Sequence, residues 1–208
     1  MPQPLNYLKE TASQTAGPYV HIGLIPGMAG FDIFEMNFSN VLVTPGIKGE
    51  RITLEGCVLD GTGTPLRDVL LEIWQANAAG RYNHPADRSA GALEDDFRGW
   101  GRAGSNFDSG LVTFETIKPG AITDKAGRKC APHINVWIVA RGINIGLNTR
   151  LYFSDEEAAN AADPVLNLIE PPVRRSTLIA KSSERGSKVV YTFTIKLQGP
   201  DETVFFDV

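Results

Sequence analysis

The residue pair with the spacing best suited to chemistry is His133 and Asn135, which stand two positions apart in an apolar segment. Residues two apart on a strand point to the same face, so one strand could present an imidazole and an amide side by side. Such a pair can supply two ligands to a metal ion. It is also common as a hydrogen-bonded pair without metal, because buried polar groups need partners. From these residues alone the hydrogen-bonded pair is the favoured interpretation.

The other histidines and the cysteines give weaker signals. His84 and Asp87 lie in a polar loop with Pro85, and we interpret them as loop residues rather than as a metal pair. Cys57 and Cys130 are expected to be free thiols, because two cysteines make no disulfide framework and no CxxC or Cys/His cluster predicts zinc. The sequence contains no HxxxH motif, no GxSxG motif and no phosphate-binding glycine loop.

The composition is that of a soluble globular protein. The 208 residues are 42% hydrophobic, and 20 basic against 24 acidic residues give a net charge of −4. These values exclude disorder and argue against nucleic-acid binding, which needs a basic face. The N-terminus lacks an apolar signal-peptide core, and no apolar run approaches the ~20 residues that span a bilayer, so we expect a cytoplasmic protein with no membrane contact.

The segments that position these residues are short and are separated by Gly- and Pro-rich turns. They predict an all-β, single-domain β-sandwich with long irregular loops and one or two short helices. Ser154 and Glu157 fit a capping box, so a helix is expected from there to Pro164. Within one structural domain we separate an N-terminal arm and irregular segment, 1–50, from the sandwich, 51–208. The expected strands are 51–59, 66–75, 111–117, 133–140 (buried on both faces), 149–153, 177–181, 188–197 and 203–207, with a long irregular segment over 76–110.

Six motifs, in order along the chain, resemble the intradiol ring-cleaving dioxygenases. The resemblance runs from about Ser13 to the C-terminus, and within the family it is strongest to an alpha subunit that pairs with an iron-bearing beta subunit. The resemblance implies a complex that cleaves 3,4-dihydroxybenzoate with O2 to 3-carboxy-cis,cis-muconate, a step of aromatic degradation. The motifs are 13–19 (SQTAGPY), 71–82 (LEIWQANAAGRY), 116–120 (TIKPG), 131–153, 163–170 (DPVLNLIE) and 202–207 (ETVFFD).

The resemblance also implies that this chain binds no metal. The family holds Fe(III) with two tyrosines and two histidines, since the hard ferric ion favours anionic oxygen. By alignment with the family motifs, the four ligand positions here are His133, Asn135, Ile122 and, in a loop that aligns less closely, Ser89. Three of the four have lost their ligand groups. We therefore expect the Fe(III) cofactor in the partner beta subunit, with no catalytic residue and no metal ligand set in this chain.

What the resemblance leaves to this chain is completion of the partner's substrate pocket. It assigns the substrate-binding residues to the segment Thr15, Gly17, Pro18 and Tyr19 and to Arg141, whose guanidinium can attract the substrate carboxylate. Without the resemblance, that segment would be interpreted as an ordinary turn and Arg141 as a surface arginine. The expected partners are the beta subunit, further alpha–beta pairs in a larger oligomer, the aromatic acid and O2.

Two other functions compete with this hypothesis. A β-sandwich assembly or binding module with no direct active-site role would use Tyr19 and Arg141 for packing alone. An iron enzyme in its own right is disfavoured by Ser89, Ile122 and Asn135. The remaining arginines considered, Arg102, Arg150 and Arg174, are expected to be solvated or ion-paired at the surface.

Overall fold

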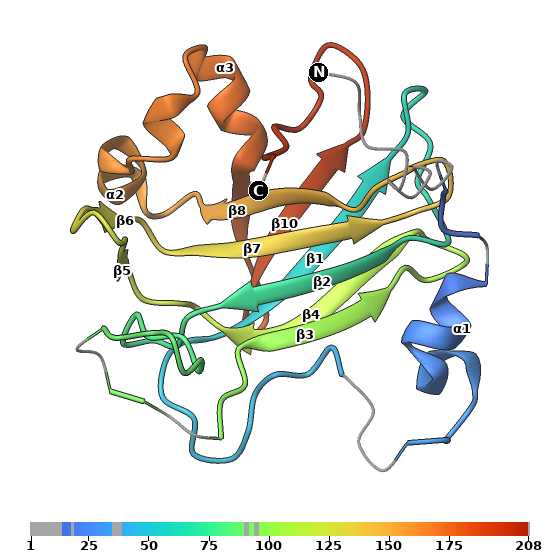
Figure 1. Cartoon of the computed structure of the whole chain (residues 1–208), viewed down its shortest axis with the longest axis horizontal. Coiled ribbons are helices and arrows are strands. Elements are labelled where there is room, and N and C mark those ends of the chain that lie inside the picture. Colours follow the sequence, from blue (N-terminus) through green and yellow to red (C-terminus); the bar gives the residue numbers. More distant parts are fainter. Residues whose placement is uncertain (1–13, 18, 35–38, 90–91, 94–95, 208) are drawn as a thin grey trace, which may run out of the picture.

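The chain folds into two facing layers of strands, as the computed structural model shows (Figure 1). The structure describes residues 14–17, 19–34, 39–89, 92–93 and 96–207. Eight strands form one continuous sheet that is bent into a sandwich, in the order β3-β2-β7-β8-β9-β10-β1-β4. The all-β sandwich predicted from the sequence is confirmed.

The two layers meet where β8 pairs with β9 in parallel, through Tyr152–Ile179 and Phe153–Ala180. Within the layers the neighbours are antiparallel, except that β1 runs parallel to β10. The strands are β1 (Arg51–Leu59), β2 (Leu70–Gln75), β3 (Trp100–Gly104), β4 (Leu111–Ile117), β7 (His133–Val139), β8 (Leu147–Phe153), β9 (Ile179–Arg185) and β10 (Lys188–Lys196), and a separate two-stranded ribbon consists of β5 (Ile122–Thr123) and β6 (Lys129–Cys130).

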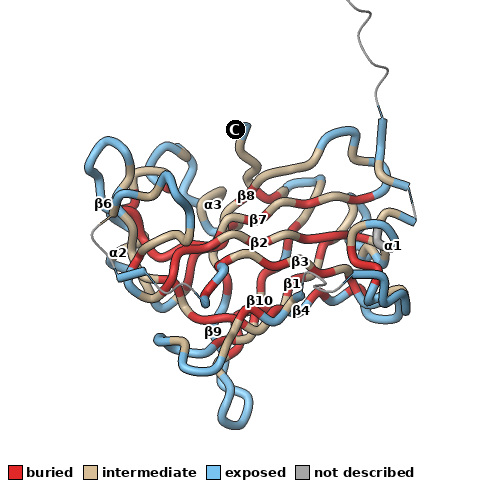
Figure 2. The backbone as a smooth tube through the Cα atoms, turned by 60° about the horizontal axis from the view of Figure 1, so that its bottom comes forward, coloured by how far each residue is buried: buried red, intermediate tan, exposed pale blue. Residues whose placement is uncertain are grey.

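The core lies between the layers and follows from the alternation in the strands. In β1 the even-numbered residues are buried and the odd-numbered ones are half-exposed or exposed. Figure 2 shows the buried backbone running along the strands of both layers. Phe153 and Tyr191 close the core in an edge-to-face pair with ring centroids 4.9 Å apart. This core holds the ends of the strands in place. The candidate functional residues lie at the ends of β7 and on its outer face.

The helices are short and lie at the ends of the sandwich. Described are three α-helices, α1 (Val20–Leu24), α2 (Glu157–Ala162) and α3 (Pro172–Arg175), and three 3-10 turns, η1 (Pro26–Ala29), η2 (Leu166–Leu168) and η3 (Ser176–Leu178). The expected capping box is wrong: Glu156 is the N-cap of α2, and the Ser154 hydroxyl instead accepts the Ser182 N–H at 3.0 Å.

Two expected strands need correction, and one strand was not expected. Residues 203–207 form only an isolated bridge, Asn148–Phe206, and β3 lies inside the segment expected to be irregular. The strand expected to be buried on both faces, β7, alternates, since Asn135, Trp137 and Val139 are half-exposed. One face of β7 therefore remains available for function. None of the described helices is long and apolar enough to cross a membrane.

Candidate functional site

The outer face of β7 carries His133 and Asn135, as their spacing predicts. Ile134 and Val136 point into the core between the layers, so the two polar residues face outward. The neighbouring strands pair with β7 in a register that places Tyr152 beside His133 and both Trp74 and Arg150 beside Asn135. The resemblance assigns this face to the lost metal site, so its contacts decide whether a metal fits.

His133 is a neutral, buried imidazole. It is 2% exposed, and its Nδ1–H donates to the Ala131 carbonyl at 2.8 Å, which leaves the lone pair on Nε2. Nε2 has no hydrogen-bond partner among the described residues. Burial, aided by the charge of Arg150, lowers the pKa of His133 to about 4. One potential metal ligand therefore persists here, in an environment that disfavours an added positive charge.

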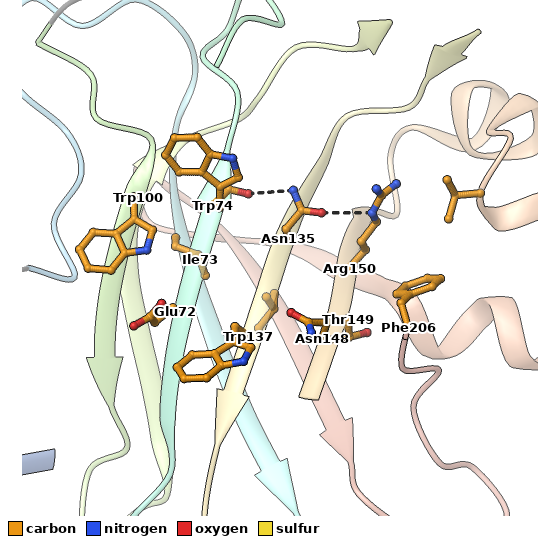
Figure 3. A pocket seen from close by; sticks show the side chains of 12 residues that line it. Glu72, Ile73, Trp74, Trp100, Asn135, Trp137, Asn148, Thr149, Arg150 and Phe206 are labelled. Atoms are coloured by element: carbon orange, nitrogen blue, oxygen red, sulfur yellow. Dashed lines mark hydrogen bonds between the residues drawn. The ribbon is translucent and has the colours of Figure 1, made fainter. Parts of the chain in front are cut away.

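Asn135 is fully engaged by its neighbours. Its Nδ2 donates to the Trp74 carbonyl at 3.3 Å, and its Oδ1 accepts the Arg150 Nε–H at 3.1 Å (Figure 3). Its Nδ2 also donates to the Tyr82 hydroxyl at 3.3 Å. The Tyr82 ring in turn stacks on Trp74 with centroids 5.5 Å apart, and burial raises the pKa of the Tyr82 hydroxyl. The amide thus takes part in a hydrogen-bonded network, as the interpretation from the residues alone favoured.

Arg150 departs from the surface role expected for it. The side chain is half-buried, and no carboxylate lies within ion-pair distance of it among the described residues. Besides Asn135 it approaches the Phe206 ring, with the guanidinium carbon 6.0 Å from the ring centroid. Arg150, Asn135 and Phe206 line a hollow of about 500 Å³ together with the three tryptophans of the chain, Trp74, Trp100 and Trp137 (Figure 3).

The other two predicted ligand positions lie in an adjoining hollow. Ser89 and Ile122 line a space of about 940 Å³ that also contains Tyr82 and shares Trp74 with the first hollow. The structure thus brings three of the four positions around Trp74 and Tyr82. These three positions offer a hydroxyl, an alkyl group and an amide. Among the described residues, the charged group hydrogen-bonded to Asn135 is the Arg150 guanidinium. No group of three or more His, Cys, Asp or Glu side chains suited to a metal occurs among the described residues. This donor set does not fit a ferric ion, which prefers anionic oxygen.

Asp163 fixes the backbone next to His133. Its carboxylate is completely buried and accepts four hydrogen bonds. The donors are the Ala131 N–H (2.8 Å), the Tyr152 hydroxyl (3.1 Å) and the N–H groups of Val165 and Leu166 (2.8 Å each). The motif at 163–170 therefore holds the start of β7 against η2 and the adjacent strand β8.

Arg141 lies just beyond the opposite end of β7. Its Nε is 2.8 Å from Asp68 Oδ2, and its side chain is 63% exposed. The next residue, Gly142, has a φ of 86°, in the left-handed region that favours glycine, and its N–H donates to the Thr15 hydroxyl at 2.9 Å. Two segments that the sequence could not connect, 13–19 and the turn after β7, are therefore in contact.

The rest of the N-terminal segment leads into α1. The Gly17 carbonyl accepts the Val20 N–H at 3.2 Å. Among the described residues, no atom lies within 4 Å of the position that a Cβ on Gly17 would take, its chain neighbours apart. Tyr19 is 74% exposed, and Pro18 lies outside the described residues. Gly17 and Tyr19 thus present backbone and ring to the surroundings rather than to the sandwich.

Sequence reasoning missed two residues of these sites. Asp68 lies within the segment 66–75 expected to be a strand, and Tyr82 is the last residue of the motif 71–82, and neither received a role of its own. The pairing of Asp68 could have been detected from the sequence. Asp68 precedes β2 by two residues and Arg141 follows β7 by two residues, so an antiparallel pair of these strands places the two residues opposite each other. Tyr82 had none, because its contacts with Trp74 and Asn135 depend on the course of the loop that follows β2.

The chain is similar in sequence to known dioxygenases. Residues 40–199 match the family described as Dioxygenase. The chain is 52% identical over 204 residues to the protocatechuate 3,4-dioxygenase alpha chain of Pseudomonas putida, which covers 98% of this chain and 99% of that one. It is 37% identical over 161 residues to the beta chain of the Burkholderia cepacia enzyme of that name, covering 74% and 67%.

A solved structure supports the same assignment. The dioxygenase domain of a dioxygenase–carbohydrate-binding protein fusion from Streptomyces sp. SirexAA-E superimposes with a TM-score of 0.56 at 25% identity, over 82% of this chain and 93% of that one. The family match over residues 40–199 includes β2, β7 and β8, which surround His133 and Asn135. The chain belongs to the intradiol ring-cleaving dioxygenase family.

Proposed function

We propose that this chain is the iron-free alpha-type subunit of a complex that cleaves 3,4-dihydroxybenzoate with O2 to 3-carboxy-cis,cis-muconate. The bond between the two hydroxyl-bearing carbons breaks, and both oxygen atoms of O2 enter the product. A paralogous beta-type partner holds the ferric ion, which supplies the binding of the catechol oxygens and the chemistry with O2. The relatives named alpha chain and beta chain support this division of roles.

The observation that carries the proposal is the separation of two groups along β7. His133 begins the strand and Arg141 follows its end, eight residues later. At about 3.3 Å per residue their Cα atoms are roughly 26 Å apart, far more than an arginine side chain can span. Arg141 therefore serves no ligand bound at His133 of the same chain. An exposed guanidinium at that end is suited to a substrate held by another subunit.

The groups at this end perform three tasks in the complex. Arg141 binds the substrate carboxylate by a charge-assisted hydrogen bond, which orients the ring. Gly17 and Pro18 bring backbone against the partner's pocket, and the Tyr19 ring covers apolar surface and excludes water. Thr15 holds the Arg141–Gly142 turn against the N-terminal segment. The assembly is expected to contain several alpha–beta pairs.

The test replaces Arg141 with alanine in the purified alpha–beta complex. Loss of a charge-assisted hydrogen bond of about 1.5–3 kcal/mol lowers kcat/KM for 3,4-dihydroxybenzoate about 10- to 150-fold. Catechol lacks the carboxylate, so its kcat/KM falls much less. Arg185→Ala is the matched control, since Arg185 is similarly exposed at 56% and pairs with Glu55 at 2.7 Å.

Two outcomes contradict the proposal. Equal losses for both substrates with unchanged iron content would give Arg141 a role in structure or assembly only, as in the competing binding-module function. A full equivalent of ferric ion in this chain, purified without a partner, would show that the chain itself binds the metal, contrary to the proposal.

A further inference from the structure

The carboxylate of Asp68 is placed opposite Arg141 by the sheet itself. In the antiparallel pair β2–β7, Leu71 faces Ile138 and Leu70 faces Val139. Continuing this register by two residues puts Asp68 opposite Arg141, just past the last ladder position. Directly opposed residues point to the same face, so their side chains are neighbours by construction.

The contact between them is an ion pair that involves Nε of the guanidinium. Arg141 Nε lies 2.8 Å from Asp68 Oδ2, and that oxygen is buried with no hydrogen-bond partner among the described residues. The Asp68 side chain is 10% exposed, whereas that of Arg141 is 63% exposed. This is the only ion pair of either residue within the described chain. The Arg141 side chain is thus held near Nε while most of it is open to solvent.

Asp68 is attached to a rigid part of the sandwich. The adjacent Val69 is 1% exposed, its N–H donates to the Ser105 hydroxyl at 3.1 Å, and its carbonyl accepts the Ser105 N–H at 2.9 Å. Arg141, in contrast, begins an exposed turn. A long side chain on an exposed turn samples many rotamers, and ordering it on binding reduces affinity. A fixed carboxylate at Nε removes part of that disorder before any ligand arrives.

We propose that Asp68 is a positioning residue that holds the Arg141 guanidinium by Nε and presents its two terminal nitrogens to the substrate carboxylate. This inference rests on the proposed function. Planar, two-pronged recognition of a carboxylate needs the guanidinium in a defined orientation, which Asp68 supplies from the adjacent strand. The negative charge of Asp68 opposes substrate binding only weakly, because Arg141 is well exposed and solvent screens the pair.

The experiment measures kcat and KM of the assembled complex carrying Asp68→Asn. Releasing one rotamer-rich side chain is expected to raise KM for 3,4-dihydroxybenzoate about 2- to 12-fold, with kcat little changed. For catechol both constants stay near wild type. Asp68→Glu keeps the buried negative charge and recovers part of the loss. Asp201→Asn is the matched control, since Asp201 pairs with Lys196 at 3.1 Å and is 67% exposed.

A double-mutant cycle separates positioning from structure. In the Arg141→Ala background, Asp68→Asn has no further effect on 3,4-dihydroxybenzoate if Asp68 acts through Arg141. An undiminished loss in that background, or equal losses for both substrates, overturns the inference. If Arg141→Ala is selective and neither Asp68→Asn nor Asp68→Glu changes KM, the inference fails while the proposed function stands. If Arg141→Ala itself is not selective, the proposed function fails first.

Discussion

An arginine lies near each end of β7, Arg150 on the neighbouring strand β8 and Arg141 just beyond β7 itself, and the two make contacts of opposite kinds. At the His133 end, Arg150 on the neighbouring strand is half-buried and bound to the neutral amide of Asn135. At the other end, Arg141 is exposed and paired with a buried carboxylate. The first guanidinium is part of an internal network. The second is anchored at one side and open at the other, which is the arrangement that a ligand requires.

Under the proposed function, the first end of β7 is where the metal site of the family is lost and the second end is where the substrate is bound. The lost metal position has not become empty space, since Tyr82, Asn135 and Arg150 form a hydrogen-bonded network there. Such a network contributes to folding but makes no use of a ligand. At the Arg141 end, Ile138 and Ala140 are still packed in the core, and the residue that follows them presents a charge to the surroundings. We therefore expect changes at the first end to affect stability and changes at the second to affect substrate binding.

The largest effect is expected for Asp163→Ala at the His133 end. The substitution leaves the N–H groups of Ala131, Val165 and Leu166 without their acceptor in a buried site. Each unsatisfied buried group costs about 1–3 kcal/mol, so the free energy of unfolding should fall by about 3–5 kcal/mol. Urea denaturation measures the change.

The exposed Asp201→Ala serves as the control for that experiment and should lie within about 0.5 kcal/mol of wild type. A stable Asp163→Ala variant that selectively lost affinity for the carboxylated substrate would break the comparison, because it would assign a binding role to the wrong end of β7.

The second largest effect is the pH dependence of the free energy of unfolding that is expected from His133. Its folded-state pKa is lowered to about 4, against about 6.5 in the unfolded chain, so the unfolded state binds the extra proton first as pH falls. The stabilisation from the neutral imidazole is therefore fully present above pH 6.5 and is lost as the pH falls toward 4. The shift corresponds to about 3 kcal/mol.

Unfolding free energies of wild type and His133→Gln across that pH range test this assignment. The variant should show a shallower loss of stability on acidification than the wild type. Identical slopes for wild type and His133→Gln would mean that His133 is not held neutral by its surroundings.

The sequence predicts the strands of this fold where one face of each is buried. Alternation gave β1 and β10 with nearly correct ends, because burial on one side imposes the period of two. It missed β3, which contains Gly101 and Gly104 and no β-branched residue. A Cβ at Gly101 would stand 2.5 Å from Leu42 Cδ1 and 2.9 Å from the Ser39 carbonyl oxygen, so glycine is required by a segment that is distant in the sequence. Local propensity carries no sign of such a contact.

The candidate sites show the same limit. The spacing of His133 and Asn135 correctly predicts a shared face, and the family motifs predict that the ligand set is incomplete. Arg150 was expected at the surface because nothing in its neighbourhood along the chain indicates that it faces Asn135 across a strand pair. The contact of Thr15 with Gly142 joins residues 127 positions apart, and only the folded chain reveals it.

The smallest effect is expected for Thr15→Val at the Arg141 end. Valine has nearly the shape of threonine but cannot accept the Gly142 N–H, which then binds water because Gly142 is exposed. The unfolding free energy should therefore change by no more than about 0.5 kcal/mol. KM for 3,4-dihydroxybenzoate in the alpha–beta complex should rise about twofold, because the turn that carries Arg141 loses one of its fixed points. Thr15→Ser retains the hydroxyl and should behave as wild type. A Thr15→Val variant that lost several kcal/mol of stability with KM unchanged would remove the distinction between the two ends of β7, since both would then serve folding alone.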